Sequence, residues 1–365
     1  MSRYLVTLKP VDKFFFGGDM TFEVAGKKEH NQMFKSYIIE SALFPQQTSL
    51  LGMMRFLLLR KSDCFDGSRI TDADKASALI GSHSFEAGSS TDGFGKIKSM
   101  TGCFIRDRLS GEDYAFAPFC KDFTVEDTGL KGIVNGIQIS LPEIKGYTAK
   151  DGYTRCLVSR NTEIKLDNVF VKDRRIGINR NIDTGLTEES ALFKQISYRF
   201  NDFDKDNCTR LADYCFAFHI EVDDVDLTSP EYDGEVVSLG ADGSQFIIHF
   251  EKDGTDNRPE SVHETALVIQ SPSYLTRDAL RLSSFFMTET VPFRFLKTSV
   301  KGTDNYTVYS NTLKRSEKYE LYAPGSVFFF QTESMKEQFV SKLKYIGETT
   351  QMNEFARIGF NEYRK

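Results

Sequence analysis

The chain has 365 residues, of which 40% are hydrophobic and 27% charged, with 32 Phe, no Trp and a net charge of −6. This composition excludes wholesale disorder, and no apolar run approaches the roughly 18–20 residues that a transmembrane helix needs. The first residues, MSRYLVTLKP, have the pattern of a strand and not of a signal peptide. We therefore expect a soluble, cytoplasmic protein that is long enough for two domains.

Charge is distributed unevenly along the chain. Residues 201–260 contain 16 Asp and Glu against 4 Lys and Arg, a local charge of −12, so the rest of the chain sums to +6. A mildly basic body with one acidic region suits a protein that binds a polyanion on one face and another partner elsewhere. Solvated acidic loops would explain the same distribution equally well.

Strands and helices alternate in the first half of the sequence. The pattern predicts a strand at Arg3–Lys9 and an apolar helix over Phe44–Lys61. A shorter helix is expected near Asp72–Ile80, and a hairpin over Cys103–Phe119 turns at the sequence SGED.

The second half repeats this alternation. Its predicted elements are strands at Ala212–Val222 and Thr265–Gln270, a hairpin at Glu235–Phe250, helices at Tyr274–Phe285 and Ser334–Lys344, and strands near 292–298 and 320–331. Sheet and helix interleave twice, which favours an α+β protein of two similar halves. We place the boundary near residue 205, giving domains 1–205 and 206–365.

Motifs for catalysis are weak. The GGD turn at Gly17–Asp19 resembles a two-metal site, but Met20 occupies the position of the second carboxylate. The six Cys have neither CxxC nor Cys/His ligand spacing, so we expect reduced thiols and no metal. His30 in KKEHNQ is the one histidine to test as a general base for metal-independent RNA cleavage.

The helix predicted over Phe44–Lys61, with Thr48 or Ser49 as its cap, carries a polar stripe. Thr48, Gly52 and Arg55 lie on one side of an otherwise apolar helix. Glycine would allow another backbone to approach closely, and Arg55 offers a planar fork for phosphate. Helix-on-sheet packing, with Arg55 extending to the surface, is the structural alternative.

A second basic segment runs from Lys172 to Phe193. Arg174, Arg175 and Arg180 flank an expected glycine turn, with the amides of Asn179 and Asn181 beside them. Such side chains hold a bent single strand by its phosphates and base edges. The following Tyr198–Phe200 adds aromatic rings of the kind that stack on unpaired bases. A solvent-exposed loop would explain the charges alone.

Four blocks, in order, are similar to the RAMP superfamily of CRISPR-associated proteins, and within it to the third-subunit family of the Cmr (type III-B) effector complexes. They are LKPVDKFFFGGDMTF, PQQTSLLGMMR, IGINRNIDTGLTEESALF and YAPGSVFFF. Glu189-Ser190 departs from the Glu-Gly that relatives often show. The glycine-rich loop typical of RAMP C-termini is reduced to IGFNEY, at 358–363.

The resemblance implies two ferredoxin-like (RRM-like) domains with inserted hairpins and loops, without catalytic activity or cofactor. It implies a subunit that holds the 5′ handle of the CRISPR RNA and bridges the large polymerase/cyclase subunit to the backbone RAMP subunits. Two alternatives stay open: a CRISPR RNA-processing endoribonuclease, and the equivalent subunit of a type III-A or III-D complex. The predicted RNA-binding residues are Gln47, Thr48, Gly52, Arg55, Arg174, Arg175, Asn179, Arg180 and Asn181.

Overall fold

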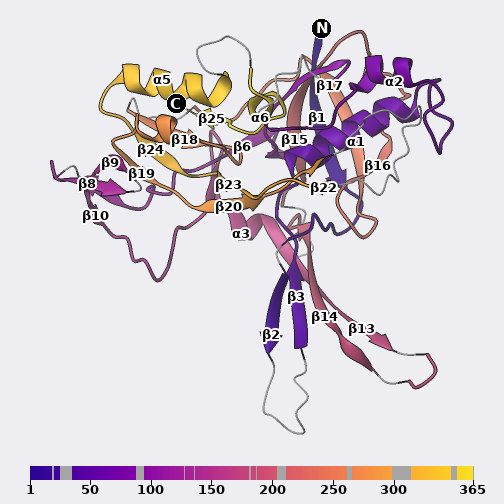
Figure 1. The fold of residues 1–365 in the computed structure, drawn as a ribbon, viewed down its shortest axis with the longest axis horizontal. Helices are drawn as coiled ribbons and strands as arrows, with labels where there is room; N and C mark the ends of the chain where they lie inside the picture. The colour runs from indigo at the N-terminus through magenta and orange to yellow at the C-terminus, as the bar shows by residue number, and fades with distance from the viewer. Residues whose placement is uncertain are drawn as a thin grey trace.

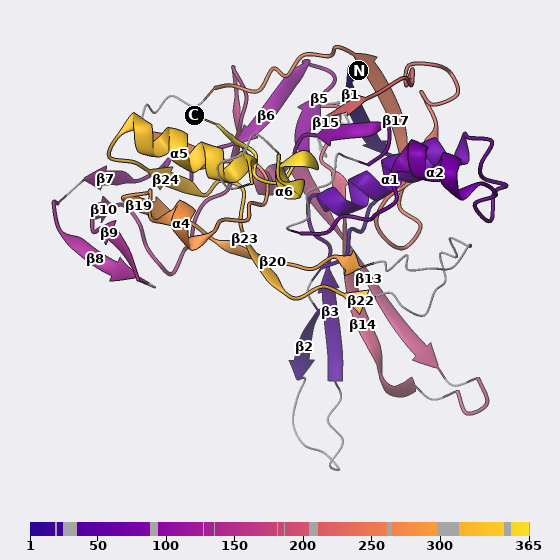
Figure 2. The same cartoon turned by 45° about the horizontal axis from the view of Figure 1, so that its top comes forward.

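The protein is a mixed α/β structure, rich in strands and with few helices (Figure 1). It consists of a body, formed by two sheets with their helices, and an arm of long strands that projects from it (Figures 1 and 2). The computed structural model describes residues 1–18, 20–24, 35–87, 94–126, 128–134, 136–180, 182–185, 187–203, 211–260, 265–297, 314–346 and 352–364.

The larger sheet of the body has nine strands in the order β12-β11-β6-β5-β15-β1-β17-β16, with β4 also paired to β15. Its strands are β1 (Ser2–Pro10), β4 (Ile97–Met100), β5 (Phe104–Asp107), β6 (Glu112–Phe116), β11 (Cys156–Val158), β12 (Glu163–Lys165), β15 (Tyr214–Val222), β16 (Val236–Ser238) and β17 (Gln245–Lys252). Strand β1 lies between β15 and β17 and is antiparallel to both. The core of this half therefore depends on pairing between residues more than 200 positions apart.

Helix α1 (Gln47–Arg60) covers one face of this sheet, and α2 (Ala73–Ile80) packs beside it. Alternate residues of β1 point toward α1, since Tyr4, Val6 and Leu8 share the main core cluster with the α1 leucines. Leu50 and Leu57 are almost completely buried, and each such side chain stabilises the fold by about 1.5–3 kcal/mol. The apolar helix predicted over Phe44–Lys61 is confirmed as a helix over Gln47–Arg60.

The smaller sheet of the body has four strands in the order β19-β24-β18-β25. They are β18 (Ala266–Ile269), β19 (Phe285–Met287), β24 (Val327–Phe329) and β25 (Tyr363–Arg364). Helix α5 (Glu333–Lys344) buries Phe339 and Leu343 against Leu267 and Ile269. Two one-turn helices, α4 (Arg277–Leu280) and α6 (Glu354–Arg357), complete this half.

Four strands form the arm, which extends away from the body in both views (Figures 1 and 2). They are β2 (Met20–Val24), β3 (Lys35–Glu40), β13 (Phe170–Arg180) and β14 (Thr187–Phe200), in the order β13-β14-β3-β2. β14 and β3 are parallel, and the other two pairs are antiparallel. The arm thus joins two segments that lie far apart in the sequence, one ending at Glu40 and the other beginning at Phe170.

The remaining strands form two-stranded ribbons, and α3 (Leu166–Val169) is a single turn before the arm. The ribbons are β7 (Thr124–Glu126) with β10 (Glu143–Lys145), β8 (Lys131–Val134) with β9 (Ile137–Ser140), β20 (Thr290–Phe293) with β23 (Tyr319–Tyr322), and β21 (Leu296–Lys297) with β22 (Lys314–Arg315).

Two local predictions are wrong. Helix α1 is preceded by Gln46, whose side chain makes no capping bond, because Thr48 and Ser49 already lie in the first helical turn. The helix predicted over Tyr274–Phe285 is reduced to the single turn α4, since Phe285 instead pairs with β24 at the edge of the smaller sheet.

The predicted division at residue 205 falls between β14 and β15, although β15 and β17 lie in the same sheet as β1. The chain passes to the smaller sheet between Lys252 of β17 and Ala266 of β18. The sheet pairing therefore argues for a later boundary than the predicted one.

Candidate nucleic-acid interface

The predicted stripe on α1 divides into buried and accessible positions. Gly52 is exposed, and a Cβ built on it would have open space around it, so no described part of this chain uses the glycine for close approach. Thr48 is half-buried. A surface contact on α1 would therefore centre on these two residues.

Gln47 belongs to the packing between the two halves of the body. It is only 3% exposed, and its amide donates to the Ile358 carbonyl at 3.1 Å and accepts from the Cys103 amide N–H at 2.8 Å. A buried amide with both groups satisfied is not available to RNA. The predicted RNA contact of Gln47 is corrected to a structural one.

Arg55 also has partners within the body. Its Nη2 donates to the Gly81 carbonyl at 3.1 Å, at the C-terminal end of α2, and its guanidinium carbon lies 6.0 Å from the centre of the Phe94 ring. A cation at the carbonyl end of a helix is stabilised by the helix dipole. Arg55 therefore joins α1 to α2, and its role toward RNA stays a prediction.

Arg174 and Arg175 lie on β13 of the arm, and both side chains are exposed. As neighbours in a strand they point to opposite faces of the arm. Within the described residues, neither side chain forms a hydrogen bond or an ion pair. These arginines thus present cationic groups to solvent on both faces of the arm.

The glycine turn expected at Gly177 does not exist, because Gly177 lies within β13 opposite Phe193 of β14. The ring of Phe193 covers the glycine: a Cβ on Gly177 would lie 2.1 Å from it. Phe193 also stacks on Tyr37 of β3, with ring centres 5.8 Å apart and planes 17° apart. An aromatic ring over a strand glycine is a recognised way to hold register in a sheet.

Arg175, two residues before Gly177, lies on the same face of the arm as this aromatic pair. A guanidinium beside stacked rings is the combination that binds unpaired bases. The sequence prediction placed this role on Tyr198 and Phe200, which are 6% exposed and pack in the core. It missed Tyr37 and Phe193, although the alternation in ALFKQISYRF is typical of a strand with Phe193 on one face.

Glu40 fixes the base of the arm. It accepts from Lys172 at 2.8 Å and from the Tyr198 hydroxyl. Burial alone would raise the pKa of the Glu40 carboxyl, but these two bonds outweigh burial and lower it. Burial and the Glu40 charge raise the pKa of Tyr198. The carboxylate thus ties β3, β13 and β14 together where they leave the body.

The structure does not bring the two predicted groups of residues together. α1 lies in the body, and β13 extends away from it (Figures 1 and 2). Asn179 and Arg180 are the last residues of β13, and Asn181 lies outside the described residues. The predicted RNA surface therefore consists of two separate regions, of which the arm has the exposed cations.

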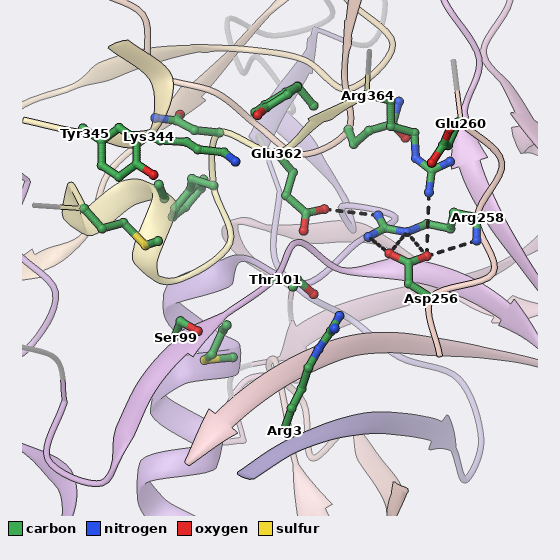
Figure 3. Close-up of a pocket in the computed structure, with 17 residues that line it drawn as sticks. Arg3, Ser99, Thr101, Asp256, Arg258, Glu260, Lys344, Tyr345, Glu362 and Arg364 are labelled. Atoms are coloured by element: carbon green, nitrogen blue, oxygen red, sulfur yellow. Dashed lines mark hydrogen bonds and ion pairs between the residues drawn. The ribbon is translucent and has the colours of Figure 1, made fainter. Parts of the chain in front are cut away.

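A buried ionic cluster that the sequence did not indicate joins the two halves (Figure 3). Arg258 donates to Asp256 at 2.7 Å and to Glu362 at 3.1 Å, and it lies 4.3 Å from the centre of the Phe104 ring. Burial alone would raise the pKa of Asp256, but Arg258 lowers it to about 2. Asp256 lies two residues before Arg258, but Glu362 and Phe104 lie on two distant segments, so the sequence did not reveal the cluster.

The backbones of the two halves also approach closely beside this cluster. Gly359 has φ of 88°, and a Cβ there would lie 2.2 Å from the Thr101 carbonyl oxygen. Gly102 also has too little space for a side chain, since its Cβ would lie 2.8 Å from the Cβ of Ser271. Glycine is therefore required at both positions. The reduced loop IGFNEY serves here as a packing surface between the halves.

Asp19 of the GGD turn and His30 lie outside the described residues. In the described part of the chain, no three His, Cys, Asp or Glu residues are arranged to hold a metal ion. The helices found in those same ranges are all too short or too polar to cross a membrane.

Comparison with known families decides the classification. The model of the family described as CRISPR-associated protein (Cas_Cmr3) matches residues 135–363. The chain belongs to the Cas_Cmr3 family. The resemblance drawn from the four sequence blocks is thereby confirmed. The matched range contains β13, β14 and the smaller sheet, whereas α1 and the first two sequence blocks precede it.

Two solved structures are similar in fold to this member of the Cas_Cmr3 family. One is a chain of the type III-B Cmr-β complex bound to cognate target RNA, 16% identical, with 99% of this chain and 96% of that chain covered and a TM-score of 0.48. The other is from the complex with cognate target RNA and AMPPnP in state 1, 15% identical, covering 98% and 94%, with a TM-score of 0.47. No curated protein sequence matches the chain.

Proposed function

We propose that this Cas_Cmr3 protein is a non-catalytic, cytoplasmic RNA-binding subunit of a type III-B CRISPR effector complex. In this proposal it holds the 5′ handle of the CRISPR RNA and bridges the large polymerase/cyclase subunit to the backbone subunits. Membership of the family supports the assignment to the effector. The exposed carboxylates of the acidic stretch 201–260 form the proposed surface toward a protein partner.

The observation that carries RNA binding is the arm. Arg174 and Arg175 are exposed there without hydrogen-bond or ion-pair partners among the described residues, and Arg175 shares a face with the Tyr37–Phe193 stack. Phosphates are bound by the cations, and bases stack on the rings. Arg180 and Asn179 continue the same strand, so they belong to the proposed surface. Thr48, Gly52 and Arg55 on α1 form a second, separate proposed contact.

We also propose that the two halves are ferredoxin-like. Without the inserted ribbons β20–β23 and the one-turn helix α6, the elements from β18 to β25 run strand, helix, strand, strand, helix, strand. In the sheet the fourth of these strands lies beside the first, followed by the third and the second. The neighbours β17, β1, β15 and β5 repeat this order in the larger sheet. There the arm and several hairpins are inserted, and residues 223–244 contain the short strand β16 in place of a second helix. This arrangement favours a domain boundary between Lys252 and Ala266.

Handle RNA binding tests the functional proposal. We expect the double variant Arg174→Ala/Arg175→Ala to bind a labelled 5′-handle RNA at least tenfold more weakly, both as the isolated chain and in the reconstituted effector. The slope of log K against log salt should fall in magnitude by about 0.7 for each phosphate that the variant no longer neutralises. The matched control is Arg69→Ala/Arg281→Ala, which removes two exposed arginines of the body. Equal affinity of the arm and control variants would contradict the proposed interface.

A further inference from the structure

A cleft of about 740 Å³ opens between the two halves of the body, next to the buried ionic cluster (Figure 3). Pockets that hold small ligands commonly measure about 300–1,000 Å³. Arg3 at the start of β1 and Thr101 line it from the larger sheet, and Lys344 and Arg364 line it from the C-terminal half. The cleft thus exists only where the halves meet.

The carboxylates that line this cleft are largely used by one arginine. Asp256 and Glu362 are both bonded to Arg258, which is only 9% exposed. Among the described residues Arg364 forms an ion pair with Asp256 alone, at 3.7 Å, and its Nη1 atom is buried without a hydrogen-bond partner. Burial and the neighbouring Arg258 charge lower the pKa of Arg364 to about 10. A largely buried guanidinium whose Nη1 atom has no hydrogen-bond partner among the described residues would be stabilised by an added anion.

Two further cations point into the cleft from opposite sides, as Figure 3 shows for Arg3 and Lys344. Neither forms an ion pair with a carboxylate of the described residues, and Lys344 contacts the ring of Tyr363, at 5.2 Å. Counting Arg258 and Arg364, four cations line the cleft against the three carboxylates of Asp256, Glu260 and Glu362. The described residues that line the cleft therefore leave it with a net positive charge.

We propose that this cleft binds a phosphate monoester of mononucleotide size. Cations that approach from several directions suit a tetrahedral group with three acceptor oxygens, and arginine pairs with phosphate through parallel N–H donors. Tyr345, Met352 and Phe360 line the rest of the cleft and provide an apolar surface for the body of the ligand. The site lies apart from the arm, so it goes beyond the proposed holding of the RNA handle.

Calorimetric titration of the full chain at low salt tests this site with three probes: inorganic phosphate, AMP and adenosine. We expect saturable binding of AMP, weaker binding of phosphate, and none of adenosine. Arg3→Gln and Lys344→Gln should each weaken AMP binding at least fivefold. Arg3 is exposed and Lys344 is half-buried, and both lie outside the Asp256–Arg258–Glu362 network, so we expect these variants to fold, which a thermal melt checks. Arg281→Gln and Lys318→Gln, exposed cations away from the cleft, serve as charge-matched controls.

The phosphate could come from a free nucleotide or from the end of an RNA, and handle RNAs with a 5′-phosphate or a 5′-hydroxyl separate these sources. A preference for the 5′-phosphate that Arg3→Gln abolishes would support the site, with the RNA as its source. The proposal is overturned if adenosine binds as tightly as AMP, if AMP does not bind, or if the control variants weaken AMP binding equally. None of these results depends on the arm, whose variants test handle binding separately.

Discussion

The body and the arm use their cationic side chains differently. In the body, Arg55 bonds the end of α2, and Arg258 is enclosed by two carboxylates and an aromatic ring. On the arm, Arg174 and Arg175 are exposed on a sheet that leaves the globular part of the molecule. A cation that already has buried partners stabilises the fold, whereas an exposed one without partners can bind another molecule. Variants in the two regions should therefore change different measured quantities.

The largest expected effect is on the stability of the body. We expect Arg258→Met to lower the free energy of unfolding by about 3 kcal/mol, because the carboxylates of Asp256 and Glu362 would remain buried without their main partner. Arg364, already 3.7 Å from Asp256, would offset part of the loss. Urea unfolding measures the effect.

Arg174→Met on the arm is the matched control for that substitution. Its side chain is exposed, so we expect its stability to stay within about 0.5 kcal/mol of the wild type. If both variants lost the same stability, the contrast between body and arm would be wrong.

The body should also respond to acid through His219. Its side chain is 1% exposed, and Nε2 lies 3.1 Å from the Gly254 carbonyl oxygen. Burial, followed by the Arg3 charge, lowers the pKa of His219 to about 4, against 6.5 for a free histidine. Between these values the unfolded chain binds more protons, so stability is lost as the pH falls from 6.5 to 4, by about 3 kcal/mol in total.

Urea unfolding at pH 7, 5.5 and 4.5 measures this loss. In His219→Gln the group no longer titrates, so the difference in stability between wild type and variant should shrink as the pH falls. A difference that stays constant across this range would contradict a neutral, buried histidine.

Local patterns in the sequence were sufficient for the helices α1, α2 and α5 and for the hairpins β5–β6 and β16–β17. The prediction of each of these elements used only hydrophobic periodicity or turn residues within about 20 positions of the chain. The arm and the domain boundary were not predictable in this way, because β3 pairs with β14 and β1 pairs with β15 and β17 across long stretches of chain.

In the candidate site, too, only features that are local in the sequence could be predicted. Arg174 and Arg175 were singled out from a local cluster of basic residues, which the structure places on the exposed surface of the arm, and their role toward RNA stays a prediction. Gln47 was assigned to RNA by resemblance, yet its amide bonds backbone groups of Cys103 and Ile358. The Tyr37–Phe193 stack and the Arg258 cluster also join distant segments. Contacts between such distant segments can be recognised only when the sheet pairing is known.

The smallest expected effect decides whether α1 takes part in RNA binding. Gly52 is exposed in the middle of α1 with open space where a Cβ would lie, so Gly52→Ala should raise the free energy of unfolding by about 0.5–1 kcal/mol. Alanine loses less backbone entropy on folding than glycine. Chemical unfolding measures this gain.

Handle RNA affinity of the same variant then separates two explanations for the glycine. If α1 only packs in the body, Gly52→Ala should be more stable and bind RNA as the wild type does. A stabilised variant that loses RNA affinity, while Arg60→Ala at the exposed end of the same helix retains it, would mean that a partner backbone approaches Gly52. The accessible part of α1 would then join the arm in the RNA interface, and the division between a packing helix and a binding arm would have to be withdrawn.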